Sequence, residues 1–291
     1  MTSTPQSGNV QTGLTGTQET LFIPLYGRWQ DFYSPRPLLG DRWSADIMAR
    51  LVDKRTETGR RMRGATSSFA FMVLRARLFD RWTAEFLAEN ARATVVHLAC
   101  GLDTRALRLR DKCGHGVKWF DVDVPEVIDL RRRIEIPEPE PTAGGYSYTM
   151  IASSVVETAW LDHLPTDRPT VIIFEGLTMY LSPEDGQNLI KRLTEHFGSG
   201  QMIFDSMPRS TRFILNITLW LKGYWNFTFD WAIDDPRSLE KLHPGMELSA
   251  MVRMWEVPGH EHMVWWLRLA AFVASWIPIL RHWFHFTRYK F

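Results

Sequence analysis

Short apolar segments alternate with charged, helix-like segments through the middle of this 291-residue chain. The apolar segments are residues 95–100, 117–122, 146–152, 170–174 and 202–204. Strands that alternate with helices form a mostly parallel sheet that is covered by helices on both faces. Ligands of such sheets bind at the carboxyl ends of the strands, near the point where the strand order reverses. The chain is therefore predicted to have an α/β fold with its site at these strand ends.

The segments on either side of this region have different patterns. Residues 67–90 place apolar side chains at helical spacing, with Ser67 or Ser68 as the N-cap. Residues 262–280, HMVWWLRLAAFVASWIPIL, are strongly apolar, but Arg268 and Pro278 interrupt them. Because a membrane span needs about 20 apolar residues, we expect a buried or lid-like helix there and no integral membrane span. The ending WFHFTRYKF is aromatic-rich and partly alternating, which suggests a final strand.

Composition excludes several classes of protein. The formal net charge of +1 gives no electrostatic reason to expect a nucleic-acid partner. The two cysteines, Cys100 and Cys113, are too few for a disulfide framework or a cysteine-rich zinc site, which suits a cytoplasmic protein. His260 and His262 are two residues apart and have no evident third ligand, so no metal site is predicted. Residues 1–18 lack the apolar core of a secretory signal, and we expect a disordered tail.

The first apolar segment ends in CGLDTR, which taken alone is either an ordinary strand-to-helix turn or a nucleotide-binding turn. Gly101 lacks a Cβ, so the backbone there can approach a ligand closely. Asp121 lies twenty residues further on and Asp123 follows it; a carboxylate at this spacing accepts hydrogen bonds from ribose hydroxyls. The alternative is that Asp123 caps a helix that begins near Pro125. No glycine-rich phosphate loop is present, so the pattern favours a nucleoside cofactor without phosphates, S-adenosylmethionine.

Glu175 directly follows the apolar segment 170–174, where a carboxylate is costly unless it is paired. Two kinds of partner would satisfy it. One is the positively charged, sulfonium-bearing amino acid end of such a cofactor. The other is a salt bridge to a neighbouring arginine, which would give Glu175 a structural role only.

Seven motifs occur in one order between residues 19 and 207: ETLFIPLYGRW, RARLFDRW, ACGLDTRALRL, FDVDVPEVIDLRR, WLDHLP, PTVIIFEGLTMYL and IFDSM. These motifs and their order resemble those of the leucine carboxyl methyltransferase superfamily. Within that superfamily, the resemblance is to the bacterial branch of polyketide (tetracenomycin-type) O-methyltransferases. The resemblance implies the class I S-adenosylmethionine-dependent methyltransferase fold, a seven-stranded, mostly parallel sheet with an antiparallel last strand, helices on both faces and an N-terminal helical cap. A single domain would comprise the cap at 19–92, the cofactor-binding core at 93–207 and substrate-side elements with the final strands at 208–291.

The resemblance also implies roles for residues of the site. Arg75 would bind the methionine carboxylate of S-adenosyl-L-methionine, and Glu175 would lie against the same end. Gly101 would let the cofactor pass the turn, while Asp123, supported by Asp121, would bind the ribose. The complete predicted cofactor-binding set is Arg75, Ala99, Gly101, Asp103, Asp121, Asp123, Ser154, Glu175 and Gly176. Catalytic residues are not identified; the positioning candidates are Tyr26 and Arg28, in the segment that closes over the site, and Tyr180.

The chain departs from the family pattern in three places. The usual Asn-Leu-Gly before the turn is His97-Leu98-Ala99, which reduces the freedom of the backbone at Ala99. Where relatives have an Asp-Leu pair after the third strand, this chain has Ser154-Val155, so a contact to adenine there would carry no charge. The part of the chain after Met207 shows little resemblance beyond its aromatic, basic end.

That unmatched part is rich in aromatic residues and contains arginines suited to a substrate carboxylate. The aromatic residues are Trp220, Trp225, Phe227, Phe229, Trp231, Trp255, Trp265 and Trp266, and the arginines are Arg209, Arg212 and Arg253. As a group the aromatic residues favour a large apolar acceptor, although each one taken singly is expected to be ordinary core.

The predicted function is methyl transfer to an oxygen of a small aromatic or polyketide-like metabolite. A carboxyl group is favoured as the acceptor, since it is ionised at neutral pH and needs no general base, whereas a phenol needs a base or a cation nearby. The alternatives are phenolic O-methylation, methylation of a protein C-terminal carboxyl group, and a non-catalytic role in binding the cofactor or a partner. Peripheral membrane association through residues 263–280 is a further alternative. Sequence does not indicate the oligomeric state.

Overall fold

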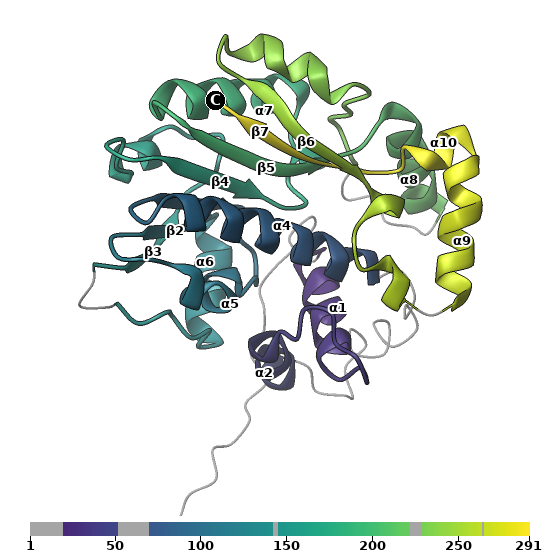
Figure 1. Ribbon diagram of the computed structural model, residues 1–291, viewed down its shortest axis with the longest axis horizontal. Helices are drawn as coiled ribbons and strands as arrows, with labels where there is room; N and C mark the ends of the chain where they lie inside the picture. The colour runs from purple at the N-terminus through teal and green to yellow at the C-terminus, as the bar shows by residue number, and fades with distance from the viewer. Residues whose placement is uncertain (1–19, 52–69, 142–144, 222–227, 264) are drawn as a thin grey trace, which may run out of the picture.

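The computed structural model describes residues 20–51, 70–141, 145–221, 228–263 and 265–291. Its centre is a seven-stranded sheet in the order β3-β2-β1-β4-β5-β7-β6 (Figure 1). The strands are β1 (Thr94–Leu98), β2 (Lys118–Asp123), β3 (Ser147–Ala152), β4 (Thr170–Phe174), β5 (Gly200–Ser206), β6 (Glu247–Arg253) and β7 (His285–Lys290). The first five strands run parallel, and β7 runs antiparallel to both β5 and β6. The predicted seven-stranded sheet with an antiparallel last strand is confirmed.

The structure confirms each of the five strands predicted in the alternating region, with ends shifted by at most two residues. The predicted final strand is β7. Sequence reasoning missed β6, whose sequence ELSAMVR has polar residues at alternate positions and a half-exposed burial pattern. An edge strand of this kind lacks the continuous apolar run that marks a buried parallel strand.

Helices cover both faces of the sheet (Figure 1). On one face α4 (Ala70–Glu89) buries Phe79, Trp82 and Phe86 in a cluster with Trp119 and Ile173 of the strands. On the other face α7 (Pro183–His196) packs Leu189 and Ile190 in a second cluster with side chains of β1, β4 and β5. The predicted N-cap residues of α4, Ser67 and Ser68, lie outside the described residues, as does the predicted tail 1–18.

A third cluster forms the N-terminal cap. It contains side chains of α1 (Phe22–Phe32), α2 (Arg42–Leu51) and α6 (Pro125–Arg133), packed around Leu102 in the turn after β1. The cap therefore lies against the turn in which the site was predicted. The shorter elements are α5 (Arg105–Arg108), η2 (Arg110–Lys112), η3 (Ala159–His163), η4 (Thr178–Tyr180), η5 (Pro236–Leu242), η6 (Met254–Glu256) and η7 (His260–His262).

Three helices, α8 (Arg209–Leu221), α9 (Trp265–Trp276) and α10 (Pro278–Arg281), lie together at one end of the sheet (Figure 1). The predicted helix at 262–280 is present as α9 and α10, which Pro278 separates. Of the two alternatives expected for this helix, buried or lid-like, the buried one is wrong. Its buried residues are the small Ala271 and Ala274, whereas its large side chains face solvent. No helix in the described part of the chain is long and apolar enough to cross a membrane.

Of the eight aromatic residues expected to be core, one is buried, two (Phe229 and Trp255) are half-buried and three are exposed. Trp231 is buried against α7 residues, while Trp220, Trp265 and Trp266 are exposed. Trp225 and Phe227 lie outside the described residues.

Stability is expected to depend on the protonation of His285, which begins β7. Its side chain is buried beside His282, 3.2 Å away, and burial, with His282 and Arg253 adding to it, lowers the pKa of His285 to about 4. An unfolded histidine has a pKa of about 6.5, so between these values the unfolded chain binds more protons. The stability that the protein has while His285 is neutral in both states is therefore fully present above pH 6.5, and it is lost as the pH falls to 4. Thermal unfolding at pH 7, 6 and 5 should show a smaller loss of Tm for His285→Gln than for the wild type; parallel curves would contradict the prediction.

Candidate active site

The turn after β1 brings the ends of two strands together. Gly101 has a φ of 53°, and its N–H donates to Oδ2 of Asp123 at 2.7 Å, which joins the turn to the end of β2. A Cβ at Gly101 would lie 2.8 Å from Cδ2 of Leu21, beside the start of α1. The left-handed backbone and this close approach together explain the glycine.

Ala99 also has a left-handed backbone, with a φ of 48°. This conformation costs a residue with a Cβ about 1 kcal/mol more than it costs glycine. We therefore expect Ala99→Gly to raise the free energy of unfolding, because it removes this backbone strain. The greater conformational entropy of glycine in the unfolded chain offsets part of the gain. Urea denaturation measures the change. Ala270→Gly, in the exposed middle of α9, should have the opposite sign, and a destabilising Ala99→Gly would contradict the prediction.

Asp123 has capacity for further hydrogen bonds. Its Oδ1 accepts from the N–H of Val124 at 2.8 Å, and Val124 is the N-cap of α6 with no side-chain capping bond. The alternative that Asp123 caps this helix is therefore wrong. Burial raises the pKa of Asp123, although its two backbone hydrogen bonds act in the opposite direction. Because a carboxylate accepts about four hydrogen bonds, two acceptor positions remain beyond these backbone contacts for ligand hydroxyls.

Asp121 has a different environment. Its carboxylate accepts from the Trp119 indole at 2.8 Å, the Tyr148 hydroxyl at 2.7 Å and the Arg131 guanidinium at 3.0 Å. The His97 ring lies 3.4 Å away. Burial opposes ionisation of Asp121, but His97 and Arg131 outweigh it and lower its pKa. These contacts occupy the acceptor positions of the carboxylate, so Asp121 joins β2 to β3 and to α6.

Arg75 joins the ends of β4 and β5 to α4. Its Nε donates to Glu175 at 3.0 Å and its Nη2 lies 2.9 Å from the same oxygen, while Nη1 donates to Asp205 at 2.6 Å. Gly176 has a φ of 70°, and its N–H donates to the other oxygen of Asp205 at 2.6 Å. The alternative salt bridge to Glu175 is thus present, and Arg105 adds a second one at 2.6 Å.

The Arg75 guanidinium still fits a ligand carboxylate. Arginine has five N–H donors, and the contacts to Glu175 and Asp205 use three of them. One donor on each Nη remains beyond these contacts, and guanidinium donors can bind a carboxylate. Burial opposes ionisation of Glu175, but Arg75 and Arg105 outweigh it and lower its pKa. Glu175 is therefore an anion that can face a positively charged group.

Sequence reasoning missed most of the charged residues beneath this site. Arg105 donates to Asp80 at 2.6 Å and lies 3.5 Å from Asp103, and Arg108 binds both acids. Burial opposes ionisation of Asp103, but these arginines and Arg28 hold its pKa well below the usual value. The signal was available, since a charged residue within an apolar stretch, such as the aspartate of IFDSM, is costly unless it is paired.

Of the three positioning candidates, Tyr26 and Arg28 lie in α1. Arg28 is buried and donates to the Ser44 hydroxyl at 3.1 Å and to the Leu102 carbonyl at 3.4 Å, with Asp103 at 3.7 Å. Tyr26 is also buried, stacked on Trp29. Arg28 thus fastens the cap to the turn after β1.

Tyr180, the third candidate, lies in η4 just beyond β4. Its hydroxyl donates to Thr20 at 3.2 Å, its ring packs against Phe229 at 5.3 Å, and burial raises its pKa. Phe229 exchanges two backbone hydrogen bonds with the side chain of Asn216 in α8, at 2.8 and 2.9 Å. Ser154 follows β3, where its hydroxyl accepts from Val156 at 3.4 Å.

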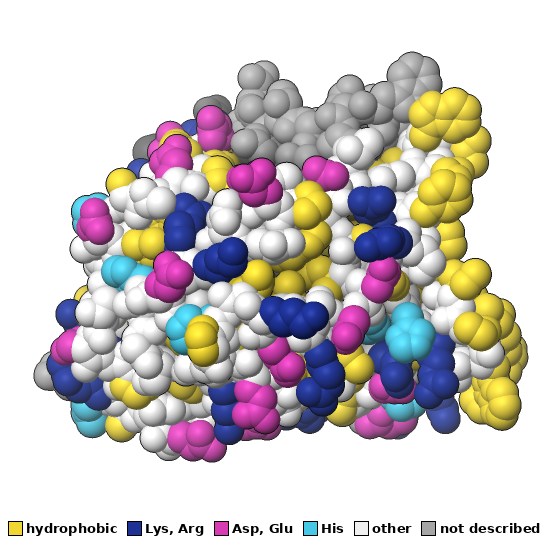
Figure 2. All heavy atoms as spheres, turned by 90° about the horizontal axis from the view of Figure 1, so that it is seen from above, with side chains coloured by type: hydrophobic (Ala, Val, Ile, Leu, Met, Phe, Trp, Pro, Cys, Tyr) yellow, Lys and Arg dark blue, Asp and Glu magenta, His cyan; other side chains and the backbone are white. Residues whose placement is uncertain are grey.

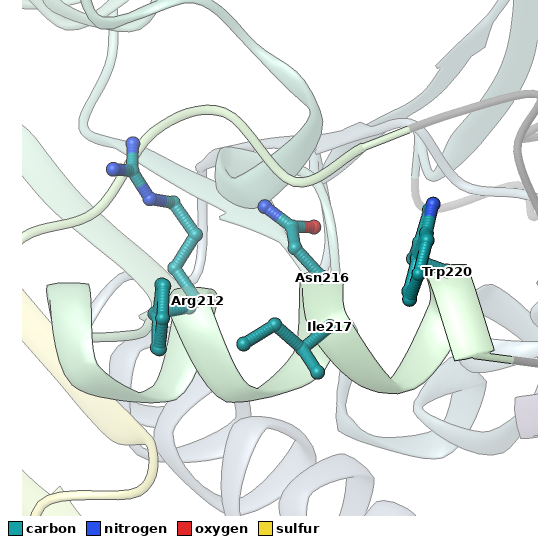
Figure 3. A pocket seen from close by; sticks show the side chains of 5 residues that line it. Arg212, Asn216, Ile217 and Trp220 are labelled. Carbon is teal, nitrogen blue, oxygen red and sulfur yellow. The ribbon is translucent and has the colours of Figure 1, made fainter.

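A hollow of about 320 Å³ lies along α8, a volume within the usual range for ligand pockets. Arg212, Asn216 and Trp220 project from the same side of the helix (Figure 3), and the hollow is lined by Arg212, Phe213, Asn216, Ile217 and Trp220. One of its lining residues, Asn216, is hydrogen-bonded to Phe229, whose ring contacts Tyr180 in η4. Within the described ranges, no group of three or more His, Cys, Asp or Glu side chains is placed to hold a metal ion.

The fold occurs in solved structures. It is similar to a putative methyltransferase from Thermobifida fusca, with a TM-score of 0.58, 13% identity, and coverage of 92% of this chain and 93% of that one. It is also similar to a DUF574 family protein from Streptomyces avermitilis, with a TM-score of 0.57, 12% identity, and coverage of 92% and 96%. At these identities the likeness shows the fold alone, which is that of the class I S-adenosylmethionine-dependent methyltransferases.

Sequence comparison identifies the family. Residues 31–194 match the leucine carboxyl methyltransferase family. The chain is 37% identical to the tetracenomycin polyketide synthesis O-methyltransferase TcmP of Streptomyces glaucescens, over 96% of this chain and 98% of that protein. It is 37% identical to the S-adenosyl-L-methionine-dependent methyltransferase dpfgK of Gibberella zeae, over 95% of each chain. The chain therefore belongs to the leucine carboxyl methyltransferase family, and its enzyme class is S-adenosyl-L-methionine-dependent methyltransferase.

Proposed function

We propose that this protein transfers a methyl group from S-adenosyl-L-methionine to a carboxyl oxygen of an aromatic, polyketide-like metabolite. The observation that carries the proposal is the 37% identity to TcmP over almost the whole of both chains. The strand-end residues described above support it, because their chemistry matches the parts of the cofactor in order.

The proposed cofactor contacts follow from the donors and acceptors that the chain leaves available. Asp123 accepts the ribose hydroxyls, and the Gly101 turn lets the nucleoside lie close to the backbone. Arg75 binds the methionine carboxylate with its remaining donors, and Glu175 lies against the same positively charged end. Ala99, Asp103, Ser154 and Gly176 complete the proposed set, with Asp121 as support.

When bound, S-adenosyl-L-methionine would supply a methyl group on a positively charged sulfur; an acceptor oxygen would form the new bond to that carbon as the carbon–sulfur bond breaks, with S-adenosyl-L-homocysteine as the leaving group. The protein's part is to align the acceptor oxygen with that methyl group and to exclude water. The cap, which Arg28 fastens to the turn after β1, covers the site, and Tyr26 and Tyr180 position the acceptor. Tyr180 donates its hydroxyl proton to Thr20, so it would position the acceptor through contacts of its ring.

A carboxylate suits these groups better than a phenol does. Glu175 has a lowered pKa and is a weak base, and Tyr180 is protonated. A phenol, with a pKa of about 10, needs a base or a cation to assist its ionisation. A carboxylate is ionised already and requires only to be oriented.

The hollow along α8 is the proposed place for the acceptor. Phe213, Ile217 and Trp220 give it an apolar, aromatic lining, and Arg212 supplies a positive charge. Arg212 donates to the carbonyl of Asp230 at 2.5 Å, a contact that uses one of its five donors.

The chemistry is tested by mass spectrometry with polycyclic aromatic acids and with matched phenols that lack the carboxyl group. We expect a methylated product from the acids, and we expect dilute hydroxide to remove the methyl group, because an ester hydrolyses whereas an aryl methyl ether does not. A product that survives hydroxide would support phenolic methylation instead. Arg212→Met should raise KM about tenfold or more at similar kcat. Arg209→Met, whose exposed side chain pairs with Asp234, is the matched control and should leave KM unchanged.

A further inference from the structure

An ordinary surface helix packs its large apolar side chains against the core, whereas α9 exposes them to solvent. Trp265, Leu269, Phe272 and Trp276 recur at the spacing of one helical face, and they are exposed; Trp265 and Trp276 expose 73% and 74% of their surface. The face that packs on the protein buries Ala271 and Ala274 instead. The helix therefore directs its largest apolar side chains away from the core.

This apolar face continues onto the neighbouring helices. Ile277 and Ile279 at α10 are exposed, and α10 packs against both α9 and α8, where Phe213 and Leu221 are exposed. In Figure 2, hydrophobic side chains gather along the edge of the molecule that α9 and α10 form in Figure 1. Soluble proteins rarely leave a continuous apolar patch of this kind without a partner.

The charge around the patch indicates the kind of partner. The helices α8, α9 and α10 contain four arginines, Arg209, Arg212, Arg268 and Arg281, and no Asp or Glu. The chain as a whole is nearly neutral, with 34 Lys and Arg residues against 33 Asp and Glu residues. The helices that carry the apolar face are therefore basic. Basic residues beside exposed tryptophans are typical of surfaces that lie in the interface of an anionic bilayer.

We propose that α9 and α10, with the adjoining part of α8, form a membrane-docking face that takes the surface of a bilayer containing anionic lipids. Its aromatic side chains enter the headgroup region and its arginines pair with lipid phosphates. The face adjoins the hollow along α8, so docking turns that hollow toward the bilayer. A second copy of the chain is a poorer occupant, because a two-fold interface would place the same basic patch against itself.

The proposal is tested by flotation of the full-length protein with vesicles of phosphatidylcholine alone and with vesicles that also contain phosphatidylglycerol. We expect flotation with the anionic vesicles only, and a loss of binding at high salt. The double variant Trp265→Ser/Trp276→Ser should lower the partition coefficient at least tenfold, and Arg268→Glu/Arg281→Glu should do the same. The matched controls are Tyr33→Ser, an aromatic side chain exposed to 67% in the cap, and Arg132→Glu on α6, and both should bind like the wild type.

Wild type that does not float with anionic vesicles would overturn the proposal, as would flotation that neither double variant reduces. Sedimentation velocity in the absence of lipid tests whether a second copy of the chain occupies the face instead. A dimer that the tryptophan variant dissociates would assign the face to self-association and overturn lipid docking. None of these outcomes depends on methyl transfer, and S-adenosyl-L-methionine binding by the variants measured in parallel reports whether the active site is intact.

Discussion

Asp123→Asn is expected to weaken binding of S-adenosyl-L-methionine about a hundredfold, because it removes charged hydrogen bonds worth about 1.5–3 kcal/mol each. The asparagine keeps the shape of the side chain but replaces one oxygen with an NH2 group. That group would face the N–H of Gly101 or of Val124, each of which now donates to the carboxylate. The loss therefore affects both the ribose contact and the turn that supports it. Calorimetric titration of wild type and variant gives the two affinities.

The control for this experiment is Asp129→Asn, an exposed aspartate on α6 that pairs with Arg132. It should bind the cofactor with unchanged affinity. An Asp123→Asn protein that is folded and retains wild-type affinity would show that the ribose is bound elsewhere. The proposed cofactor set would then lose the residue on which it most depends.

The second large effect is expected on stability, from Arg105→Leu. Arg105 is fully buried and binds Asp80 and Glu175 at 2.6 Å each, with Asp103 at 3.5 Å. Breaking a buried pair by removing one partner costs about 3–5 kcal/mol, because the remaining charge is left without compensation. The acidic partners of Arg105 keep their contacts to Arg108 and Arg75, so we expect a loss near the lower end of this range. Urea denaturation that follows intrinsic tryptophan fluorescence measures it.

Arg92→Leu provides the matched comparison, since Arg92 also pairs with an aspartate, Asp167, but both side chains are more than half exposed. Exposed pairs of this kind contribute about 0–1 kcal/mol. The two variants should therefore differ by several kcal/mol although each removes one arginine from an Arg–Asp pair. Equal effects would mean that the buried network contributes no more than a surface pair does.

Much of the fold could be predicted from the sequence because parallel strands leave a strong local signal. The run Thr170–Phe174 is apolar after its first residue, and the structure places β4 on the same residues. The antiparallel edge was harder, since β6 alternates polar residues with half-buried ones. The position of α9 was predictable from its composition, but its orientation was not, because hydrophobicity alone does not say which face of a helix meets the core.

The residues of the site could be named from the sequence, but their partners could not. Arg75, Glu175 and Asp123 were predicted from motifs, whereas the roles of Asp205 and Arg105 depend on side chains that come together only in three dimensions. The two aspartates of FDVD look alike in sequence. In the structure, side chains of the protein occupy the acceptor positions of the Asp121 carboxylate, whereas Asp123 keeps acceptor positions for a ligand. Distinguishing them requires the positions of Tyr148 and Arg131, which lie on other elements.

The contacts of Arg75 have a consequence for the order in which the chain folds. Its two acidic partners, Glu175 and Asp205, lie 100 and 130 residues further along the chain. Contacts of such long sequence separation form slowly, because much of the chain must be ordered before they can be made. A nascent or partly folded chain that still lacks β5 therefore holds Arg75 without one of its two partners. The carboxylate end of the proposed cofactor site is complete only once the central sheet is assembled, so ligand capture would report on the final stage of folding.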